Sequence, residues 1–218
     1  MYLFGEEGII PLKQLNLQAN ALNMNFNAKY HATADQLTQE HTQVEAAKRD
    51  PNFFAPLYNK YYKQIFSYVY QRMEDKDTAF DVTSQVFLKA LSNLSKYEFK
   101  GVPFASWLYR IAQSEVYQMF RDKKAKRTVN ADVGDLRFIF EELEESYYDD
   151  YKPQVIKLLK ELPEEDLKLI EMRFFEKRQF KEIAEILDIT ENNAKVKLYR
   201  ILEKIKKTLT SKKNKPMM

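Results

Sequence analysis

The sequence predicts an all-α protein with two small helical domains joined by an acidic linker. Apolar residues make up 44% of the 218 residues and only four glycines occur, a composition typical of folded, mostly helical chains. Apolar side chains recur at helical spacing in two blocks, and the acidic stretch between the blocks has little periodicity. We therefore expect a flexible N-terminal extension, a first domain, a linker, a second domain and a basic tail, bounded in that order by residues 1–37, 38–127, 128–152, 153–210 and 211–218.

The composition excludes several classes of protein. The chain contains no cysteine, which fits a reducing compartment and excludes disulfides and thiolate metal sites. His31 and His41 are too few for a metal or acid/base centre, and the sequence has no glycine-rich phosphate loop, so we expect neither an enzyme nor a cofactor. No apolar run approaches the roughly 18 residues of a membrane span, and the N-terminus lacks the cations of a signal peptide. We expect a cytoplasmic protein.

Two helices are predicted to open the first domain. The first should run over Thr38–Lys48 and end at Asp50, because a residue before proline is pushed out of helical geometry. The second should cover Phe53–Met73. Its predicted inward residues are Phe54, Leu57, Tyr58, Tyr61, Ile65, Phe66, Val69 and Tyr70.

The third helix is expected to begin at Asp77 or Thr78, either of which can cap it. It continues through AFDVTSQVFLKAL, with the core face Ala79, Val82, Val86, Phe87, Ala90, Leu91 and Leu94. Asp81, Gln85 and Lys89 follow one another every four residues on the opposite side. Taken alone, this polar row predicts a solvated helix face.

A helix over Phe104–Arg121 carries two stripes when its residues are placed at about 100° each. One stripe is apolar and predicts a core face, formed by Phe104, Ala105, Leu108, Ile111, Ala112, Val116 and Met119. The other stripe consists of Trp107, Arg110, Ser114, Tyr117 and Arg121. Aromatic rings that alternate with guanidinium groups can stack unpaired bases and neutralise their phosphates. An amphipathic helix whose Trp and Tyr fill the edge of the core has the same pattern, so this helix alone leaves both interpretations open.

Two neighbouring segments favour nucleic acid. The segment Arg121–Arg127, RDKKAKR, has five cations in seven residues, among them Lys123 and Lys124. The loop before the helix carries Tyr97 and Phe99 beside lysines, and both rings are expected at the surface. Beyond Arg127, eight acids accompany a single arginine from residue 132 to residue 150, which is typical of a linker, although Phe138, Ile139, Phe140 and Leu143 could support a short helix there.

The second domain contains a helix-turn-helix pattern. A first helix should begin at Pro163 with acids in its first turn and end near Glu176. A short helix over Phe180–Leu187, a turn of three residues and a longer helix capped by Thr190 should follow. The outer side of the last helix offers Asn192, Asn193, Lys195, Val196, Lys197, Tyr199 and Arg200. A purely structural helical corner has the same outline, but amides and cations near the start of this helix favour DNA.

Five motifs, in this order, resemble regions 2 and 4 of bacterial RNA polymerase sigma factors of the extracytoplasmic-function (ECF) group. They read LYNKYY, AFDVTSQVFLKAL, FASWLYRIA, LPEEDLKLIEMRFF and FKEIAEILDITENNAKVKLYRILEKIK. The resemblance implies a non-catalytic protein that binds core RNA polymerase at the coiled coil of the largest subunit and at the flap region, recognises promoter DNA and helps to separate its strands. It also allows an inhibitory anti-sigma factor as a partner.

The resemblance also assigns roles to residues. Asp81, Gln85 and Phe87 match positions that dock on core polymerase, and Lys89 continues the polar row of Asp81 and Gln85. Trp107 and Arg110 match the strand-opening segment of region 2. The residues that match contacts to the −35 element are Lys195, Val196, Tyr199 and Arg200 for bases and Asn192 and Asn193 for phosphates.

Two departures from the family pattern stand out. Gln113, Ser114 and Gln118 replace residues that family members commonly use in region 2 to recognise promoter DNA. The sequence therefore does not predict which bases this helix reads. Asp188 replaces the customary glycine in the turn, and aspartate tolerates left-handed backbone better than most residues. The alternative function is a helix-turn-helix repressor or activator that binds duplex DNA without polymerase, which would leave the first domain's polar row and cationic stripe without a role.

Overall fold

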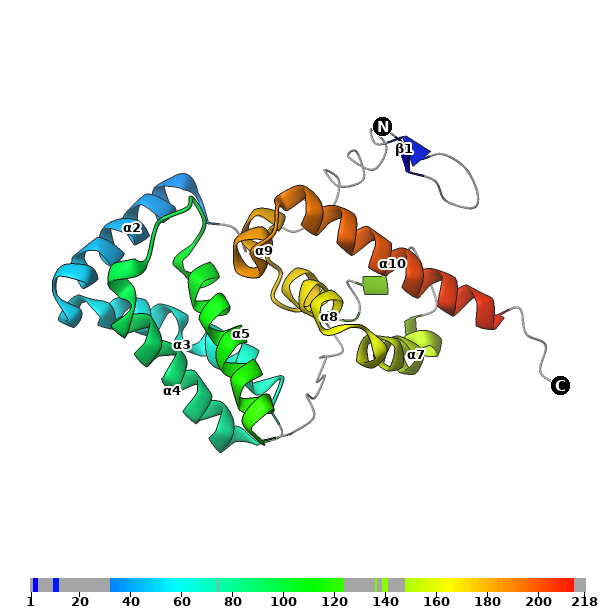
Figure 1. The fold of residues 1–218 in the computed structure, drawn as a ribbon, viewed down its shortest axis with the longest axis horizontal. Helices are drawn as coiled ribbons and strands as arrows, with labels where there is room; N and C mark the ends of the chain where they lie inside the picture. Colours follow the sequence, from blue (N-terminus) through cyan, green and yellow to red (C-terminus); the bar gives the residue numbers. More distant parts are fainter. Residues whose placement is uncertain are drawn as a thin grey trace. The chain divides into compact units, whose positions relative to one another are not determined.

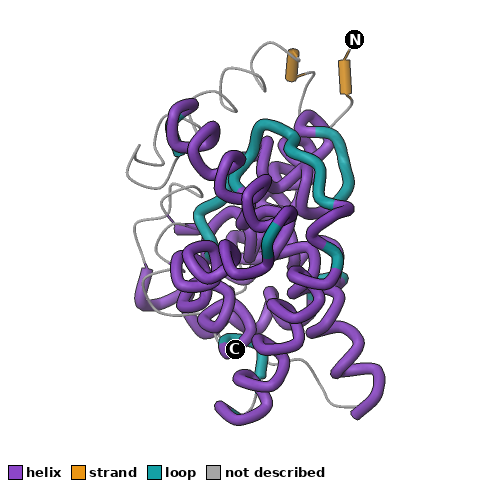
Figure 2. Tube along the Cα trace, turned by 90° about the vertical axis from the view of Figure 1, so that its left-hand side faces the viewer, coloured by secondary structure: helices purple, strands orange, loops and turns teal. Residues whose placement is uncertain are grey.

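The computed structural model describes residues 2–3, 10–11, 32–73, 75–123, 136, 139–140 and 148–213. The chain forms two units, Met1–Ala32 and Thr33–Met218. In the first unit, β1 (Tyr2–Leu3) pairs antiparallel with β2 (Ile10–Pro11). Every helix that the structure describes lies in the second unit (Figures 1 and 2). The all-α prediction is therefore confirmed for the part of the chain that carries the two helical blocks.

The first helix, α2 (Ala34–Arg49), begins four residues before the predicted start at Thr38. The reason is a capping box: the Thr33 hydroxyl accepts the Gln36 N–H at 3.3 Å, and the Gln36 side chain accepts the Thr33 N–H at 2.9 Å. At the other end, the Asp50 carboxylate accepts the N–H of Asn52 and starts a 3₁₀ turn, η2 (Pro51–Phe54). Part of the expected flexible extension is thus an ordered first turn.

The next helix, α3 (Ala55–Tyr70), buries Leu57, Tyr61, Ile65 and Val69 as predicted, together with Tyr68, which the periodicity did not place inward. The inward predictions for Tyr58 and Tyr70 are wrong, because these side chains are 39% and 46% exposed. The rings of Tyr58, Tyr62, Phe66 and Tyr70 instead pack on one another in sequence, with centroids 5.2–6.1 Å apart. Aromatics four residues apart on a helix cover one another, so each ring needs less burial in the core.

The third helix, α4 (Lys76–Ser92), is capped by Asp75 and not by Asp77 or Thr78. The Asp75 carboxylate accepts the Thr78 N–H at 2.7 Å, which satisfies one of the free donors of the first turn. A 3₁₀ turn, η3 (Leu94–Lys96), follows. The core face is largely as predicted, with Ala79, Val82, Val86, Phe87, Ala90 and Leu94 buried.

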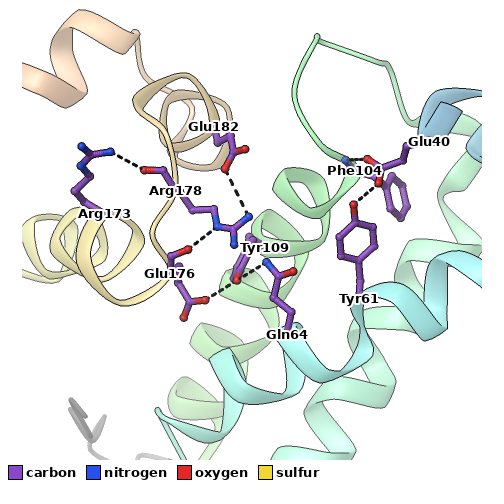
Figure 3. A network of polar contacts seen from close by, with 9 residues as sticks. All are labelled: Glu40, Tyr61, Gln64, Phe104, Tyr109, Arg173, Glu176, Arg178 and Glu182. Atoms are coloured by element: carbon purple, nitrogen blue, oxygen red, sulfur yellow. Dashed lines mark hydrogen bonds and ion pairs between the residues drawn. The ribbon is translucent and has the colours of Figure 1, made fainter. Parts of the chain in front are cut away.

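The central helix, α5 (Phe104–Lys123), packs against α3 and α4 and completes the first bundle. Glu40, a buried acid on α2, accepts the Phe104 N–H at 2.6 Å and so caps α5 from another helix (Figure 3). In the preceding loop Tyr97 is only 6% exposed, so the prediction of a surface ring there is wrong. Tyr97 packs edge-on against Phe104, with ring centroids 5.1 Å apart.

The second bundle consists of four α-helices among the described residues: α7 (Tyr148–Glu161), α8 (Glu164–Ile170), α9 (Phe180–Leu187) and α10 (Glu191–Lys213). A π-helical turn, η4 (Glu171–Phe175), extends α8. The start of α7 lies inside the predicted linker, and Leu136, Ile139 and Phe140 are helical and buried. Phe138 and Leu143 lie outside the described residues.

Local signals predicted the helix-turn-helix correctly. The bounds of α9 match those predicted, and α10 begins after Thr190, whose hydroxyl accepts the Asn193 N–H at 3.1 Å. Asp188 has the left-handed backbone that a turn residue needs here, with φ of 56°. Its tolerance of this conformation explains how the turn forms without glycine.

Candidate nucleic-acid and polymerase interfaces

The last helix, α10, separates its two faces clearly. Ala194, Leu198, Ile201 and Leu202 are buried against the rest of the second bundle. On the outer side, Asn192, Asn193 and Arg200 are exposed, whereas Lys195, Val196, Lys197 and Tyr199 are half-buried. The exposed amides occupy the first turn, where free backbone N–H groups and the helix dipole favour an anion such as phosphate.

Ion pairs hold two of the predicted DNA-binding lysines. The Lys195 ammonium lies 2.7 Å from the Glu191 carboxylate one turn earlier, and Lys197 lies 3.6 Å from Asp166 of α8. These pairs orient the lysines, but a phosphate must compete with a carboxylate for each of them. Within the described part of the chain Arg200 forms no ion pair, and its exposed side chain lines an open hollow. The other residues that line this hollow are Glu203, Lys204, Lys207 and Thr208.

The second stripe of α5 lies only partly at the surface. Ser114, Tyr117 and Arg121 are exposed, with 51% of Tyr117 accessible. Trp107 is half-buried, and its ring packs on Tyr97 and Phe104 at centroid distances of 5.3 and 5.5 Å. Trp107 therefore supports the core edge and also reaches the surface. The Lys123 side chain and all of Lys124 lie outside the described residues.

Arg110, the other predicted strand-opening residue, has a partner on α9. Its Nη2 lies 2.8 Å from the Glu185 Oε1 and also donates to the Glu185 backbone carbonyl. Lys100 approaches the same carboxylate at 3.1 Å. Glu185 of the second bundle therefore binds the Arg110 guanidinium that was expected to face DNA.

The polar row on α4 is exposed, as predicted from its spacing. Asp81 and Gln85 line one open hollow between α4 and α5, together with Thr78, Val82, Glu115, Gln118 and Met119. The Lys89 ammonium lies 2.6 Å from the Glu115 carboxylate of α5. Phe87 is only 4% exposed and packs edge-on against the Tyr58 ring at 4.8 Å, so it can support the row from below rather than face a partner.

Figure 3 shows a polar network that crosses the two bundles through Gln64, Tyr109 and Glu176, which the sequence did not reveal. The Tyr109 hydroxyl, on α5, donates to the Glu176 carboxylate at 2.5 Å, and the Gln64 amide of α3 lies 3.0 Å from the same hydroxyl. Burial raises the pKa of Glu176 above its usual range, an effect that the nearby Arg72 charge opposes. Burial and the charge of Glu176 likewise raise the pKa of Tyr109 well above its ordinary value.

A buried ion pair lies beside this network. Arg72, in the turn after α3, is 1% exposed, and its Nη2 lies 2.8 Å from the Glu171 Oε2. Its Nη1 lies 3.9 Å from Glu176, and the guanidinium covers the Tyr68 ring at 3.6 Å. Although burial alone would lower the pKa of Arg72, attraction to Glu171 raises it above the ordinary value. Arg72 carries its charge in the closed interior.

Two domain families match the chain. Residues 57–126 match Sigma-70 region 2, and residues 153–205 match Sigma-70 region 4. The RNA polymerase sigma factor SigV of Bacillus subtilis (strain 168) is 30% identical over 150 residues, which cover 69% of this chain and 84% of SigV. This chain is an ECF sigma factor. The helix-turn-helix regulator that acts without polymerase is not favoured, because such a protein would not need region 2.

Further relatives of this chain are also sigma factors. The sigma factor YlaC of B. subtilis is 28% identical over 71% of this chain and 90% of YlaC. The ECF sigma factor BldN of Streptomyces coelicolor is 25% identical over 76% of this chain, which spans only 64% of BldN. Among solved structures, CnrH in complex with the cytosolic domain of CnrY superposes with a TM-score of 0.52 and 16% identity, covering 79% of this chain and 97% of CnrH. The likeness to CnrH supports the fold of this sigma factor.

Neither a membrane-spanning helix nor a metal-binding cluster is found among the described residues. None of the described helices combines the length and the apolar character needed to cross a bilayer. Within the same residues, histidines and acids do not gather in a group of three or more that could hold a metal ion.

Proposed function

We propose that this sigma factor binds core RNA polymerase through the exposed row on α4, reads a −35 promoter element with α10 and helps to open the strands with α5. The observation that carries the proposal is the exposed outer face of α10 at the end of a well-formed helix-turn-helix, on a chain that also has region 2. The proposed role is non-catalytic, and it places the protein in the cytoplasm, where transcription takes place.

The docking proposal for α4 is supported by exposure and charge. Asp81 and Gln85 are accessible, polar and one turn apart, and they border the hollow between α4 and α5. A side chain of the polymerase coiled coil could enter this hollow and pair with Asp81. Lys89 would contribute less, because Glu115 holds its ammonium. We propose the flap region of polymerase as the contact for region 4.

In the promoter proposal, the start of α10 positions the protein on the DNA backbone and a later part of the helix reads bases. Asn192 and Asn193 at the helix start are suited to phosphates, whereas Arg200 extends from an exposed position two turns later. Lys195, Val196, Lys197 and Tyr199 lie between them on the same outer side. The lysines around the open hollow beside Arg200 extend the cationic face along the DNA backbone.

The strand-opening proposal rests on Trp107, Arg110, Ser114, Tyr117 and Arg121, with Lys123 and Lys124 continuing the cationic segment. Tyr117 has the most accessible ring among them and could stack a flipped base.

Because CnrH was solved with the cytosolic domain of CnrY, we also propose that a protein partner, an anti-sigma factor, binds this chain when it is free of polymerase.

Reconstituted transcription tests the function. Purified protein is added to core polymerase. The complex is then used to select bound fragments from the genomic DNA of the organism that encodes the protein. Enriched promoters are then assayed for run-off transcripts. We expect transcripts only when both proteins are present. Promoter binding by the protein without core polymerase, with no transcription after core is added, would support a polymerase-independent regulator instead.

A further inference from the structure

Opposite charges line the surfaces where regions 2 and 4 meet. Arg72, Lys100 and Arg110 of region 2 face Glu171, Glu176 and Glu185 of region 4 at the distances given above. One further polar contact joins the loop before α5 to α9, where Lys181 donates to the Gly101 carbonyl at 2.8 Å. We name these six charged side chains, with Tyr109, the closing contact.

The backbone of region 4 is shaped for this contact. Glu171 and Glu176 are five residues apart, a spacing that would put them about 140° from each other around an α-helix. Here the Glu176 N–H donates to the Glu171 carbonyl at 2.9 Å, the i to i+5 bond of a π-helical turn. Because residues five apart share a side in such a turn, both carboxylates face Arg72. Local π-turns of this kind occur often at functional positions.

The chemistry of the closing contact favours reversible closure. Arg72 and Glu171 are 1% and 2% exposed, and each buried charge loses hydration when the regions close. Attraction between the charges then offsets much of that cost but rarely exceeds it by a large margin. When the regions part, water solvates both groups again. A polar contact of this kind therefore leaves the open and closed forms closer in free energy than an apolar interface of equal size would.

Closure affects the two DNA-binding faces differently. Arg110 is held by Glu185, and α9 packs on α5, so the proposed strand-opening face is partly covered. Asn192, Asn193 and Arg200 stay exposed on α10. Closure therefore hinders the strand-opening face and leaves the −35 helix accessible.

We propose that the closing contact is an autoinhibitory clamp that keeps free sigma factor from engaging core polymerase and melted DNA. This inference rests on the proposed function. The proposed function has α4 on the polymerase coiled coil and region 4 on the flap, and only the open form would let the two regions reach both places at once. If the closed form predominates tenfold, the apparent affinity for core falls by about tenfold, because the dissociation constant is divided by the competent fraction. Breaking the clamp should recover most of that factor.

Two charge reversals open the clamp without touching residues assigned to polymerase or DNA. Glu185→Lys places an ammonium against Arg110 and Lys100, and Lys100→Glu places a carboxylate beside Glu185. The Lys100 side chain is 48% exposed in a loop, so its replacement should not unfold the bundle. Glu161→Lys is the matched control, because it makes the same charge change at an exposed position on α7.

Spin labels measure closure directly. The chain has no native cysteine, so Lys96→Cys on η3 and Lys206→Cys on α10 place one label at an exposed position of each bundle. We expect a narrow distance distribution in the free protein, a broad and longer one in Glu185→Lys and in Lys100→Glu, and no change in Glu161→Lys. Circular dichroism verifies that each variant keeps its helices. In parallel, both clamp variants should bind core polymerase several-fold more tightly.

The outcomes separate this inference from the proposed function. A broad distribution in the unmodified free protein, or an unchanged narrow one in folded Lys100→Glu and Glu185→Lys, overturns the clamp while core binding and transcription stand. Label distances that respond as expected, in a protein that binds no core polymerase, would support the closing contact and refute the proposed function. Broadened distances with unchanged affinity for core would refute autoinhibition.

Discussion

Glu40 of α2 accepts the backbone N–H of Phe104, 64 positions later in the chain, at 2.6 Å. The same buried carboxylate lies 2.6 Å from the Lys60 ammonium and accepts the Tyr61 hydroxyl proton. An acid in the core therefore joins three helices and supplies the missing cap of α5. This carboxylate therefore helps to hold the N-terminal end of the helix that carries Trp107.

Glu40→Ala should lower the free energy of unfolding by about 3–5 kcal/mol, because it removes the partner of buried and half-buried donors. Glu40→Gln, which keeps an acceptor but loses the charge, should cost about 1–3 kcal/mol. Urea unfolding followed by circular dichroism measures both losses. The control is Glu45→Gln on the same helix, where 40% of the side chain is accessible and the change should be within about 0.5 kcal/mol. Equal stability of Glu40→Ala and the control would contradict the capping role.

Asp81→Arg combined with Gln85→Ala should weaken binding to core polymerase by at least about tenfold, since a reversed charge at an interface can cost several kcal/mol. Both side chains are exposed, so thermal stability should change little. Binding is measured by fluorescence anisotropy of labelled sigma factor. Glu98→Arg, another exposed acid of region 2, serves as the control. Undiminished affinity of the double variant would remove the docking assignment.

Arg200→Ala should weaken binding to the cognate −35 duplex by about 1–3 kcal/mol if the guanidinium reads a base. Lys195→Ala should have a smaller effect, because the Lys195 ammonium already pairs with Glu191. Titrations at several salt concentrations separate the roles: loss of a phosphate contact lowers affinity for all sequences and reduces the salt slope by about one. Lys206→Ala, an exposed lysine of the same helix, is the control. Unchanged cognate binding by Arg200→Ala at every salt concentration would exclude it from the interface.

Trp107→Leu and Arg110→Ala test strand opening. Trp107 packs on Tyr97 and Phe104, so its replacement should lower the melting temperature modestly, whereas Arg110→Ala should not. Both should reduce permanganate reactivity of thymines in the promoter bubble, since stacking contributes about 1–3 kcal/mol per base. A pre-melted promoter should restore transcription. Full bubble formation by both folded variants would refute the assignment, and Phe99→Leu controls for loss of a nearby aromatic ring.

The buried Glu176 predicts a pH dependence of stability. Its pKa is raised in the folded protein, mainly by burial and despite the charges of Arg72 and Arg178, with Glu171 adding to the rise. A raised carboxyl pKa means that the folded state binds the proton more tightly, so this contribution to stability is complete below about pH 4.5 and decreases as pH rises to the folded pKa. Urea unfolding across this range should show the decrease relative to Glu176→Gln. A Glu176→Gln curve with the same pH slope would contradict it.

The sequence predicted best where short-range chemistry decides the structure. Pro163, Asp188 and Thr190 each act on backbone within a few residues, and the helices they delimit lie where expected. The start of α2 was missed because its capping box lies outside the apolar repeat: Thr33 and Gln36 precede the first apolar residue that faces the core. Glu40 did give a signal, since it shares the spacing of Val44 and Ala47, both buried.

Contacts between distant residues left no such signal. Arg72 and Glu171 are about a hundred positions apart, and no local sequence pattern around either residue indicates that the two form a pair. Tyr97 was expected at the surface because of its polar neighbours, yet packing against Phe104 buries it. Exposure of Asp81 and Gln85 followed from helical spacing, whereas the pairing of Arg110 with Glu185 required the three-dimensional arrangement of both regions.

The π-turn makes closure depend on how the helix winds between two acids. If η4 took regular α-helical winding with all of its residues kept, Glu176 would turn about 140° away from Glu171, even though both glutamates would still be present. A related sigma factor could therefore keep both acids and lose the clamp, a change that a comparison of aligned residue identities would overlook. The winding of region 4 at this turn, rather than the acids themselves, would then mark which sigma factors restrain themselves.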